Sequence, residues 1–318
     1  MTIALVGTGS MAHEYYKVLK EFSDDIVVIG NSPASVRAFE IETNAEAYSG
    51  GFVNVVKSSD FDPSRITHAI VAVGAESLFQ VTRDIIKTGI KNILVEKPAC
   101  LYEHQLGELV GYQSSDDGLG IYVGYNRRFY QSVMQLEECL LADGGLLSFT
   151  FDFTEWSHIV EREVQSDIIK NNWFIANSTH VVDLAFFIGG EIKDLSSYTS
   201  GSLSWHDKAI YSGAGITKEN ILFSYHSNWS SAGRWSLEFN SPARKYILRP
   251  LESLQAIDRG TVKKYEISTK AEYDKRFKPG LYLQVEAFLN GNVQRLCNLD
   301  QHLRMFRIYK KISADPSI

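Results

Sequence analysis

The sequence predicts an α/β fold in which a doubly wound parallel sheet is followed by an α+β part with an open, mostly antiparallel sheet. Up to about residue 123, short apolar strands alternate with helical stretches, which is the pattern of a parallel sheet covered by helices. After residue 145, several segments alternate apolar and polar residues with a period of two, and all 5 tryptophans of the 318-residue chain lie there. Such alternation is typical of a sheet with one buried face. We therefore expect two domains, residues 1–123 and 124–318.

The first domain begins with a short apolar run, Ile3–Val6, that reads as a strand. The remaining strands and helices are predicted from apolar runs and helix-compatible composition. The expected strands are Ile26–Ile29, Ala69–Val73, Asn92–Val95 and Ile121–Val123, and the expected helices are Ser35–Glu42, Ser77–Thr88 and Tyr102–Gln113. Ligands of a doubly wound sheet bind beyond the carboxyl ends of its strands, so functional residues are sought there.

The second domain shows its period-two pattern most clearly in three segments. They are Phe149/Phe151/Phe153, Ile221/Phe223/Tyr225 and Trp235/Leu237/Phe239, each with polar or small residues between. Two helices are expected beside this sheet, His180–Ile188 and Leu281–Leu289. We expect the helices to cover one side of the sheet.

Composition excludes several classes of protein. The hydrophobic fraction of 44% and the charged fraction of 22% are ordinary for a globular protein. The net charge of −6 argues against nucleic acid or an anionic membrane as a partner. No apolar run reaches the ~20 residues of a membrane helix, and the glycine turn at Gly7 interrupts any signal-peptide pattern. We therefore expect a cytoplasmic protein. Its three cysteines, Cys100, Cys139 and Cys297, lie in no metal-ligand spacing, so no metal site is predicted.

A glycine-rich turn follows the first strand directly, in the pattern Gly7-x-Gly9-x-x-Ala12. A strand that turns into a helix presents backbone N–H groups and a positive helix end to a pyrophosphate. Gly7 permits the tight turn, Gly9 allows the phosphate to approach, and Ala12 allows close packing of helix and strand. We predict a dinucleotide site made by Gly7, Gly9, Ser10, Met11 and Ala12. The alternative is a strand–helix turn that binds nothing.

A second motif, Glu96-Lys97-Pro98, ends the strand that begins at Asn92. Proline stops the strand and holds the two charged residues where α/β sites form. A partly desolvated lysine can donate a proton to a substrate oxygen and stabilise charge there. The alternative is a surface ion pair that caps the strand. The sequence leaves open whether the Lys97–Pro98 bond is cis.

Two further segments carry candidate polar groups. Tyr125 to Phe129 follows the next strand and contains two adjacent arginines, which are suited to a polyol, carboxylate or phosphate unless they form a solvated face. His180 opens the strongest helix of the second half, with Ser178 or Thr179 expected as its N-cap and Asp183 near the first turn. A histidine at a helix N-terminus has a lowered pKa and suits the role of a base, although a single histidine is more often structural.

Taken together, these motifs resemble the glucose–fructose oxidoreductase/inositol dehydrogenase family (Gfo/Idh/MocA). The resemblance rests on the glycine turn, Glu96-Lys97-Pro98, the arginine segment and His180-x-x-Asp183, in this order, and it covers essentially the whole chain. It implies that residues 1–123 form a Rossmann domain that binds NAD(P). It implies that residues 124–318 bind substrate and build dimers or tetramers through their open sheet.

The same resemblance implies roles for individual residues. Lys97 matches the lysine that contacts the reacting oxygen, and His180 matches the histidine that faces substrate and nicotinamide. Glu96 and Pro98 match supporting positions of the motif, and Arg128 matches a recurring arginine near the site. Glu96 and Lys97 are also expected to bind the cofactor, beside the predicted position of the nicotinamide.

Many members carry an aspartate four residues before the histidine, where this chain has Ala176. The resemblance therefore leaves open what replaces that carboxylate.

A second departure lies after the strand that ends at Val73. The Thr-Pro turn of the family appears here as Val73-Gly74. Detailed roles for Ala75 and Glu76 therefore do not follow from the resemblance.

Cofactor choice depends on the end of the second strand. A carboxylate there binds a ribose 2′-hydroxyl and favours NAD. This chain has Asn31 and Ser32 at that point, and Arg37 about one helical turn further on. Without the carboxylate a 2′-phosphate is not repelled, so we expect NAD(P) as the cofactor with a preference for NADP.

Further substrate-binding candidates lie in the second domain. Aromatic faces stack on sugar rings and arginines favour carboxylate or phosphate groups, which selects Trp156, Arg162 and Trp173. These join Tyr125, Arg128, Lys97 and His180 as the predicted substrate-binding set. Tryptophans such as Trp156 and Trp173 are more often core residues than pocket residues.

The sequence therefore predicts an NAD(P)-dependent oxidoreductase that transfers a hydride to or from a sugar, sugar nucleotide or polyol. One alternative keeps the fold and changes the substrate to a non-sugar ketone, a dihydrodiol or a tetrapyrrole. A second is a dinucleotide-sensing regulatory protein without turnover. The sequence leaves the substrate, the direction of reaction and the number of subunits open.

Overall fold

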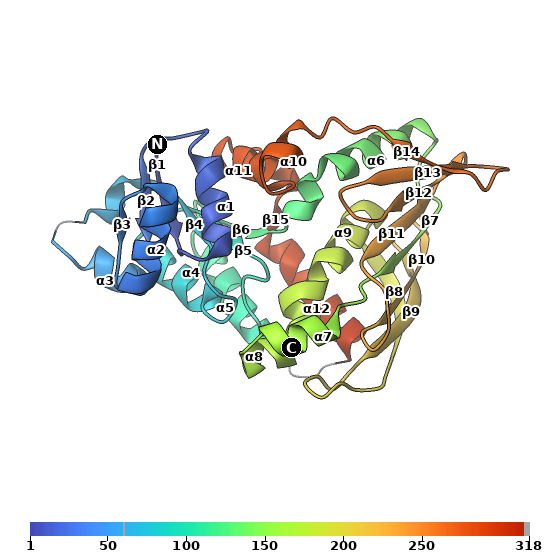
Figure 1. The fold of residues 1–318 in the computed structure, drawn as a ribbon, viewed down its shortest axis with the longest axis horizontal. Coiled ribbons are helices and arrows are strands. Elements are labelled where there is room, and N and C mark those ends of the chain that lie inside the picture. The colour runs from blue at the N-terminus through green and yellow to red at the C-terminus, as the bar shows by residue number, and fades with distance from the viewer. Residues whose placement is uncertain (60, 315–318) are drawn as a thin grey trace. The chain divides into compact units, whose positions relative to one another are not determined.

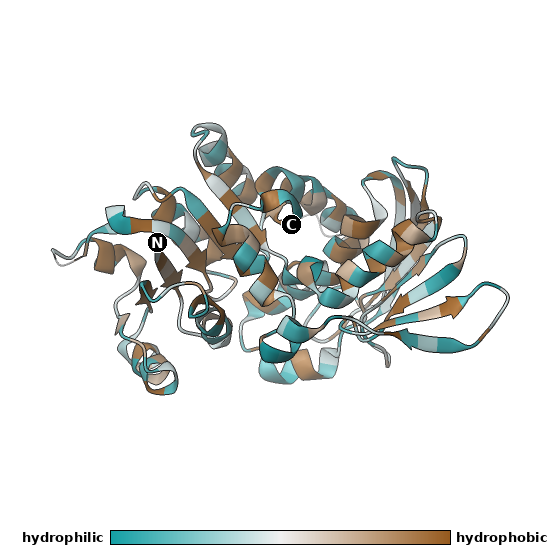
Figure 2. Cartoon of the chain, turned by 90° about the horizontal axis from the view of Figure 1, so that it is seen from above, coloured by the Kyte–Doolittle hydropathy of each residue, from teal (hydrophilic) through white to brown (hydrophobic). Residues whose placement is uncertain are grey.

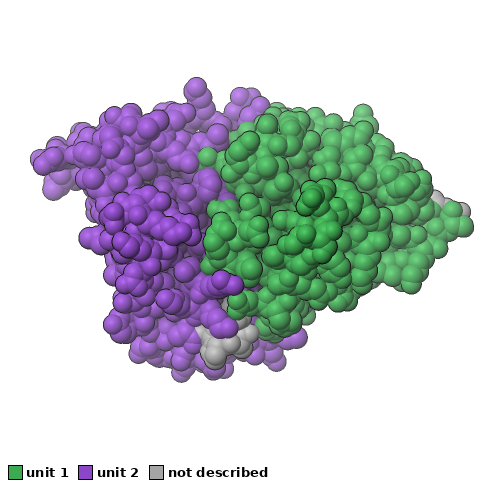
Figure 3. Space-filling view, turned by 180° about the vertical axis from the view of Figure 1, so that it is seen from behind, with its two compact units in different colours: residues 1–125, 276–304 green, residues 126–275, 305–318 purple. Residues whose placement is uncertain are grey.

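The computed structural model describes residues 1–59 and 61–314, which divide into two compact units (Figure 3). Unit 1 consists of Met1–Tyr125 and Arg276–Arg304. Unit 2 consists of Asn126–Lys275 and the chain from Met305 to the end of the described residues. Each unit is built around one large sheet (Figure 1).

Unit 1 contains a seven-stranded sheet with the order β15-β6-β5-β4-β1-β2-β3. All neighbours are parallel except β15, which runs antiparallel to β6. The strands are β1 (Thr2–Val6), β2 (Ile26–Ile29), β3 (Ala47–Tyr48), β4 (Ile66–Val71), β5 (Asn92–Glu96), β6 (Gly120–Gly124) and β15 (Cys297–Asn298). The order reverses direction at β1, so the ends of β1 and β4 form the switch point where such sheets bind ligands.

The central strands of this sheet are mostly apolar because helices cover both faces of a parallel sheet. Every residue of β1 is buried, and in Figure 2 the strands near the N-terminus are mostly brown. The helices of unit 1 are α1 (Ser10–Leu19), α2 (Pro33–Thr43), α3 (Phe52–Val56), α4 (Leu78–Ile86), α5 (Glu103–Ser114) and α11 (Leu281–Leu289), with 3-10 turns at Pro63–Arg65 and Val293–Arg295. The predicted doubly wound sheet is therefore confirmed.

The chain returns to unit 1 near its C-terminus, which differs from the continuous second domain expected over residues 124–318. Helix α11 packs against α1, with the rings of Phe22 and Tyr282 5.0 Å apart. The Arg276 guanidinium pairs with Glu21 at 3.2 Å, and β15 extends the sheet beside β6. These contacts join residues far apart in the sequence, so local patterns could not reveal them.

Unit 2 contains an eight-stranded sheet with the order β14-β13-β12-β11-β7-β10-β9-β8. Its neighbours are antiparallel except β7 and β10, which are parallel. The strands are β7 (Ser148–Asp152), β8 (Ile192–Ser200), β9 (Ile210–Thr217), β10 (Leu222–Asn228), β11 (Ser236–Asn240), β12 (Arg244–Leu248), β13 (Leu254–Asp258) and β14 (Lys264–Ile267). The predicted open, mostly antiparallel sheet is confirmed.

One face of this sheet is buried by helices. Phe149 and Phe151 of β7 are buried and stack on Phe223 and Tyr225 of β10, with ring centroids 5.3 and 5.2 Å apart. The edge of Phe186, from α9, packs on Phe223 at 4.9 Å. The helices that lie in or begin in this unit are α6 (Gln131–Ala142), α7 (Ser157–Glu163), α8 (Asp167–Asn171), α9 (Thr179–Gly189) and α10 (Glu272–Arg276), while α12 (Leu299–Ser313) begins in unit 1 and ends here. The opposite face carries exposed side chains.

No helix in residues 1–59 and 61–314 combines the length and the apolar character that a membrane span requires.

Candidate functional site

The turn between β1 and α1 has the geometry that the glycine pattern predicts. Gly7 has φ +130°, and a Cβ there would lie 2.2 Å from the Ala72 carbonyl oxygen. Gly9 precedes α1 as its N-cap in an extended conformation, and a Cβ there would meet no atom within 4 Å. Gly7 is therefore required by the packing of β1 on β4, whereas Gly9 leaves open space above the N-terminus of α1. No acidic residue occupies the first turn of α1, so that helix end remains favourable to an anion.

A cavity of about 340 Å³ lies at the carboxyl ends of β1, β2 and β4. This position is the switch point of the sheet, and the volume falls within the range of ligand pockets. Three predicted cofactor residues line it: Gly7, Gly9 and Asn31. The sequence analysis missed other residues of its wall: Thr8, Gly30, Ser35, Gly51, Phe52, Gly74 and Ser77.

The other predicted cofactor residues do not line this cavity. Ala12 is fully buried, consistent with close helix–strand packing. Ser32 caps α2, and its Oγ accepts a hydrogen bond from the Ser35 backbone N–H at 3.1 Å. Arg37 is exposed on the same helix. Met11 is half-buried in the first turn of α1.

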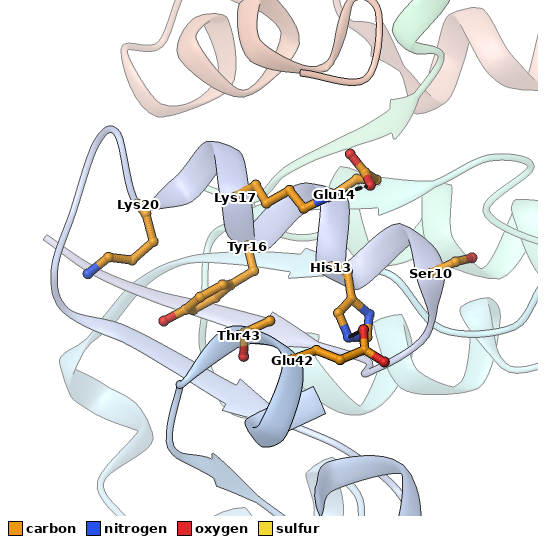
Figure 4. A pocket seen from close by; sticks show the side chains of 8 residues that line it. All are labelled: Ser10, His13, Glu14, Tyr16, Lys17, Lys20, Glu42 and Thr43. Atoms are coloured by element: carbon orange, nitrogen blue, oxygen red, sulfur yellow. Dashed lines mark hydrogen bonds and ion pairs between the residues drawn. The ribbon is translucent and has the colours of Figure 1, made fainter. Parts of the chain in front are cut away.

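Ser10 lines a different hollow, an open groove between α1 and α2 (Figure 4). There the His13 ring of α1 and the Glu42 carboxylate of α2 point toward one another, with Nε2 and Oε2 3.1 Å apart. Lys17 and Lys20 also border the groove, but Glu14 and Asp24 already pair with them at 2.9 and 2.8 Å. This groove is therefore a solvated surface of paired charges rather than the second half of the dinucleotide cavity.

Strand β5 ends in a tight turn at the Glu96-Lys97-Pro98 motif. The Ala99 backbone N–H donates to the Glu96 carbonyl oxygen at 2.9 Å, and the Lys97–Pro98 peptide bond is cis. The His302 Nε2–H donates to the Pro98 carbonyl oxygen at 2.8 Å. Lys97, the predicted catalytic lysine, is half-buried on this turn.

Glu96 is held by a buried network, so the alternative of a surface ion pair is wrong. Its Oε1 accepts a hydrogen bond of 2.7 Å from the Tyr15 hydroxyl of α1. That hydroxyl also lies 3.4 Å from Gln284 Oε1 of α11. Burial raises the pKa of the Glu96 carboxyl, while the Tyr15 hydrogen bond and the charge of Lys97 oppose the shift. Burial and the neighbouring Glu96 charge raise the pKa of Tyr15. No local pattern indicated Tyr15 or Gln284, because α1 and α11 are remote in the chain.

Tyr125 comes directly after β6, whose Gly124 pairs with Glu96 of β5. Lys97 and Tyr125 are therefore the next residues on two neighbouring strands of unit 1. The Tyr125 side chain is buried, and its ring centroid lies 5.7 Å from that of His302.

In unit 2, the expected N-cap before His180 is wrong. A π-helical turn, Phe174–Ser178, runs directly into α9, so His180 does not lie at a free helix end. Ser178 makes no capping hydrogen bond, and the Thr179 hydroxyl donates to the Ile175 carbonyl oxygen at 2.9 Å. The His180 side chain is buried and its ring lies 6.0 Å from that of Trp235.

Arg128 and Asp183 form a buried bidentate ion pair. Arg128 Nε donates to Asp183 Oδ2 at 2.8 Å, and Nη2 donates to Oδ1 at 2.6 Å. The guanidinium lies 4.7 Å from the ring centroid of Phe187, and Arg128 is only 1% exposed. Both oxygens of the Asp183 carboxylate are therefore occupied by Arg128. We assign this pair to holding α9 rather than to contact with a substrate.

A buried carboxylate that the sequence analysis missed, Glu155, contacts the π-helical turn that precedes α9. Glu155 Oε1 accepts a hydrogen bond of 2.7 Å from the Ser178 hydroxyl. The Asn177 Nδ2 lies 3.0 Å from Oε1 and 3.1 Å from Oε2. Arg234 Nη1 pairs with Oε2 at 3.1 Å. Burial raises the pKa of Glu155, and the Ser178 hydrogen bond and the Arg234 charge oppose the shift. A signal for it existed, since Glu155 continues the buried odd-numbered positions 149, 151 and 153.

Two of the predicted aromatic substrate residues meet at a small cavity beside this carboxylate. Trp156 and Trp173 both line a space of about 150 Å³, together with Glu155, Asn177 and Arg234. Trp156 is half-exposed, and its indole N–H donates to the Gly233 carbonyl oxygen at 3.0 Å.

Arg162 does not line this cavity. Its exposed side chain pairs with Glu163 at 2.9 Å.

The candidate catalytic residues are thus divided between the units, Lys97 in unit 1 and His180 in unit 2. Among the described residues, no three His, Cys, Asp or Glu side chains group in a way that could hold a metal ion.

Comparison with known family models gives a match in the first part of the chain. The model of the Gfo/Idh/MocA family, described as an oxidoreductase family with an NAD-binding Rossmann fold, matches residues 1–119. The match covers the glycine-rich turn and strands β1 to β5 of the unit 1 sheet. The predicted family and the predicted oxidoreductase class are confirmed at this level. A search of curated protein sequences finds no match.

Solved structures extend the similarity of fold over both units of the chain. UDP-N-acetylglucosamine 3-dehydrogenase from Acidithiobacillus ferrooxidans has a TM-score of 0.76 at 14% identity, covering 99% of this chain and 97% of that chain. An oxidoreductase from Agrobacterium radiobacter, in complex with NAD+, L-tartaric acid and magnesium, has a TM-score of 0.78 at 12% identity, covering 99% and 96%. A levoglucosan dehydrogenase in complex with NADH and L-sorbose has a TM-score of 0.78 at 13% identity, also covering 99% and 96%. At these identities the similarity establishes the fold.

Proposed function

We propose that this protein is an NAD(P)-dependent oxidoreductase that transfers a hydride between the nicotinamide and a carbon of a sugar, sugar nucleotide or polyol. The observation that carries the proposal is the cavity at the switch point of the unit 1 sheet, which opens over Gly9 and the N-terminus of α1. It lies within the residues that match the NAD-binding family. Two of the similar structures are named as dehydrogenases of carbohydrates, which supports a substrate of that class.

The residues at the turn fit a dinucleotide. Open space above Gly9 allows a pyrophosphate to approach the backbone, and the positive end of α1 faces that space without a competing acidic side chain. When bound there, the cofactor supplies or accepts the hydride. The residues of the chain then bind the substrate, orient it and move the proton.

Lys97 is our candidate for proton transfer at the reacting oxygen. It is half-buried, which favours exchange of a proton over permanent hydration. The neighbouring carboxylate, that of Glu96, accepts a hydrogen bond from Tyr15 of α1. This contact fixes the end of β5 from which Lys97 extends. His180, buried in unit 2, is our candidate to position the substrate oxygen or to act as a base.

The end of β2 supports a preference for NADP. Neither Asn31 nor Ser32 carries a charge that would repel a 2′-phosphate. The hydroxyls of Ser32 and Ser35 lie 2.9 Å apart at the N-terminus of α2, where the helix end favours an anion. Arg37 lies exposed on the same helix and adds positive charge.

We also propose a cytoplasmic location and a homodimer or homotetramer built on the sheet of unit 2.

Turnover of a Lys97→Met variant tests the proposed function. The wild type is expected to change the absorbance of the reduced nicotinamide with at least one member of a panel of sugars, sugar nucleotides and polyols. Lys97→Met should lower kcat by about 10²-fold or more, the scale of acid–base catalysis, while dinucleotide binding is retained.

The matched control is Lys91→Met. Lys91 lies just before the other end of β5, exposed and paired with Asp116, and its removal should leave turnover unchanged. Full turnover of Lys97→Met would refute the assignment of the lysine. Dinucleotide binding by the wild type without turnover of any substrate would favour the sensing protein instead.

A further inference from the structure

A guanidinium in unit 2 is held rigidly beside the cavity that Trp156 and Trp173 line. Arg234 Nη1 pairs with the buried carboxylate of Glu155 at 3.1 Å. Its guanidinium carbon lies 4.8 Å from the ring centroid of Trp156 and 4.3 Å from that of Trp235. An arginine stacked on aromatic rings and anchored by an ion pair has lost most of its conformational freedom before any ligand arrives.

The carboxylate that anchors Arg234 is itself fully satisfied. Glu155 also accepts hydrogen bonds from Ser178 and Asn177, and its side chain is 1% exposed. Because its oxygens are already occupied by these partners, we assign Glu155 the role of orienting them. The Arg234 side chain, in contrast, is 41% exposed.

A second guanidinium, that of Arg127, lies on the indole of Trp235. The Arg127 guanidinium carbon is 4.8 Å from the ring centroid of Trp235, and the ring of His180 lies 6.0 Å from that indole.

The two carboxylates that line the cavity are each paired with an arginine, Glu155 with Arg234 and Glu163 with Arg162. Arg127 adds further positive charge on the indole that Arg234 contacts. A planar guanidinium binds carboxylate or phosphate oxygens through parallel N–H donors.

We propose that Arg234, oriented by Glu155 and supported by Arg127 through Trp235, is an oxyanion subsite for the substrate. The ligand group is a carboxylate or a phosphate carried by a sugar-like molecule, whose ring can pack on Trp156 or Trp173 at the adjoining cavity. This inference rests on the proposed function in one respect, because it assigns the anion to the substrate of that reaction. It narrows the substrate class from sugars and polyols in general to anionic derivatives of them.

Binding to the full-length protein tests the proposal without requiring hydride transfer. Calorimetry would compare a neutral hexose, the corresponding hexuronate and the hexose 6-phosphate, which share a ring and differ in charge. We expect at least one anionic form to bind about tenfold or more tightly than the neutral hexose, the scale of one charge-assisted hydrogen bond. The form that binds better identifies a carboxylate or a phosphate as the group recognised.

Arg234→Met should abolish this preference and leave the affinity for the neutral hexose unchanged. Since Arg234→Met leaves the Glu155 carboxylate without its cation, the double variant Glu155→Gln/Arg234→Met is measured beside it. The double variant should lose the preference for the anionic hexose to the same extent. Arg259→Met, at an exposed arginine elsewhere in unit 2, should keep the preference.

The proposal is overturned if neither anionic hexose binds more tightly than the neutral one, or if the preference survives in both Arg234 variants. Failure of the proposed function gives a different result, namely binding of an anionic hexose without turnover.

Discussion

In the proposed function, the choice of cofactor depends most directly on Asn31. It lines the cavity at the end of β2, and its side-chain Oδ1 lies 3.1 Å from the position that a Cβ on Gly51 would take. A carboxylate of the same size would therefore occupy the same place, where it would repel a 2′-phosphate and accept a hydrogen bond from a ribose hydroxyl.

We expect Asn31→Asp to shift the ratio of affinities for NADP and NAD toward NAD by about tenfold or more, the cost of placing like charges together. Fluorescence titration with each dinucleotide measures the ratio. Asn44→Asp is the matched control. It adds the same charge at the C-cap of α2, the helix that follows Asn31, and should leave the ratio unchanged. An unchanged ratio in Asn31→Asp would remove Asn31 from the cofactor site.

The sequence predicted single residues well where the local backbone conformation requires a particular residue type. It predicted them poorly where the role of a residue comes from a partner that is remote in the sequence. Gly7 follows from the tight turn after β1, and its positive φ bears this out. Tyr15 and Gln284 reach Glu96 from helices far apart in the sequence, so nothing local predicted them. Glu155 is an intermediate case, because the alternation of β7 marks its position as buried but cannot supply its partners.

Among the elements, helix α9 shows most clearly how a buried charge pair fixes a helix. Asp183 lies on α9, and Arg128 lies in the 3-10 turn Asn126–Phe129. Both side chains are 2% exposed, so neither charge has water as an alternative partner. Removal of one partner leaves the other charge buried without compensation.

Arg128→Met should destabilise the protein by about 3–5 kcal/mol, the usual cost of breaking a buried pair. Replacing both residues, as Arg128→Met/Asp183→Leu, should recover a large part of that loss because no charge is left buried. Denaturant unfolding of the two variants measures both free energies. A loss below about 1 kcal/mol for Arg128→Met would show that the pair does not hold α9.

The elements of unit 1 were predicted more closely than the start of α9. Residues 26–29 and 281–289 were expected as a strand and a helix and are found with those bounds, since their apolar periodicity agrees with their burial. The π-helical turn before α9 was not expected, because Ser178 and Thr179 are good N-cap residues in sequence. The Ser178 hydroxyl instead donates to the remote Glu155 carboxylate, and the Thr179 hydroxyl donates to the Ile175 carbonyl oxygen within the same turn, so neither hydroxyl caps α9.

For the molecule as a whole, the open face of the unit 2 sheet is the feature that suggests self-association. Its outward residues on β9 and β10 include Ser212, Ala214, Ser224 and His226, which are exposed small or polar side chains, and Leu222, which is 61% exposed. The opposite face carries the buried aromatic residues. The alternation in the sequence predicted both faces of this sheet, but not the strand order or the return of residues 276–304 to unit 1.

We expect light scattering after gel filtration to give a dimer or tetramer for the wild type at micromolar concentration. Ala214→Arg, which places a charge between Ser224 and Ser196 on neighbouring strands, should give a monomer. Ser202→Arg adds the same charge in an exposed loop and should not. A wild-type monomer, or an Ala214→Arg variant that still associates, would exclude this face as the interface.

Calorimetric titration of the protein with NADP and NAD, repeated on Gly9→Ala, tests the central claim most directly. A Cβ at residue 9 meets no protein atom within 4 Å, so the variant should fold normally and yet block the approach of the pyrophosphate. We predict binding of a dinucleotide by the wild type and a loss of affinity of about tenfold or more in Gly9→Ala, with no loss in the control Gly107→Ala on α5, where a Cβ also meets open space. Absence of binding by the wild type, or equal affinity in Gly9→Ala, would contradict the account.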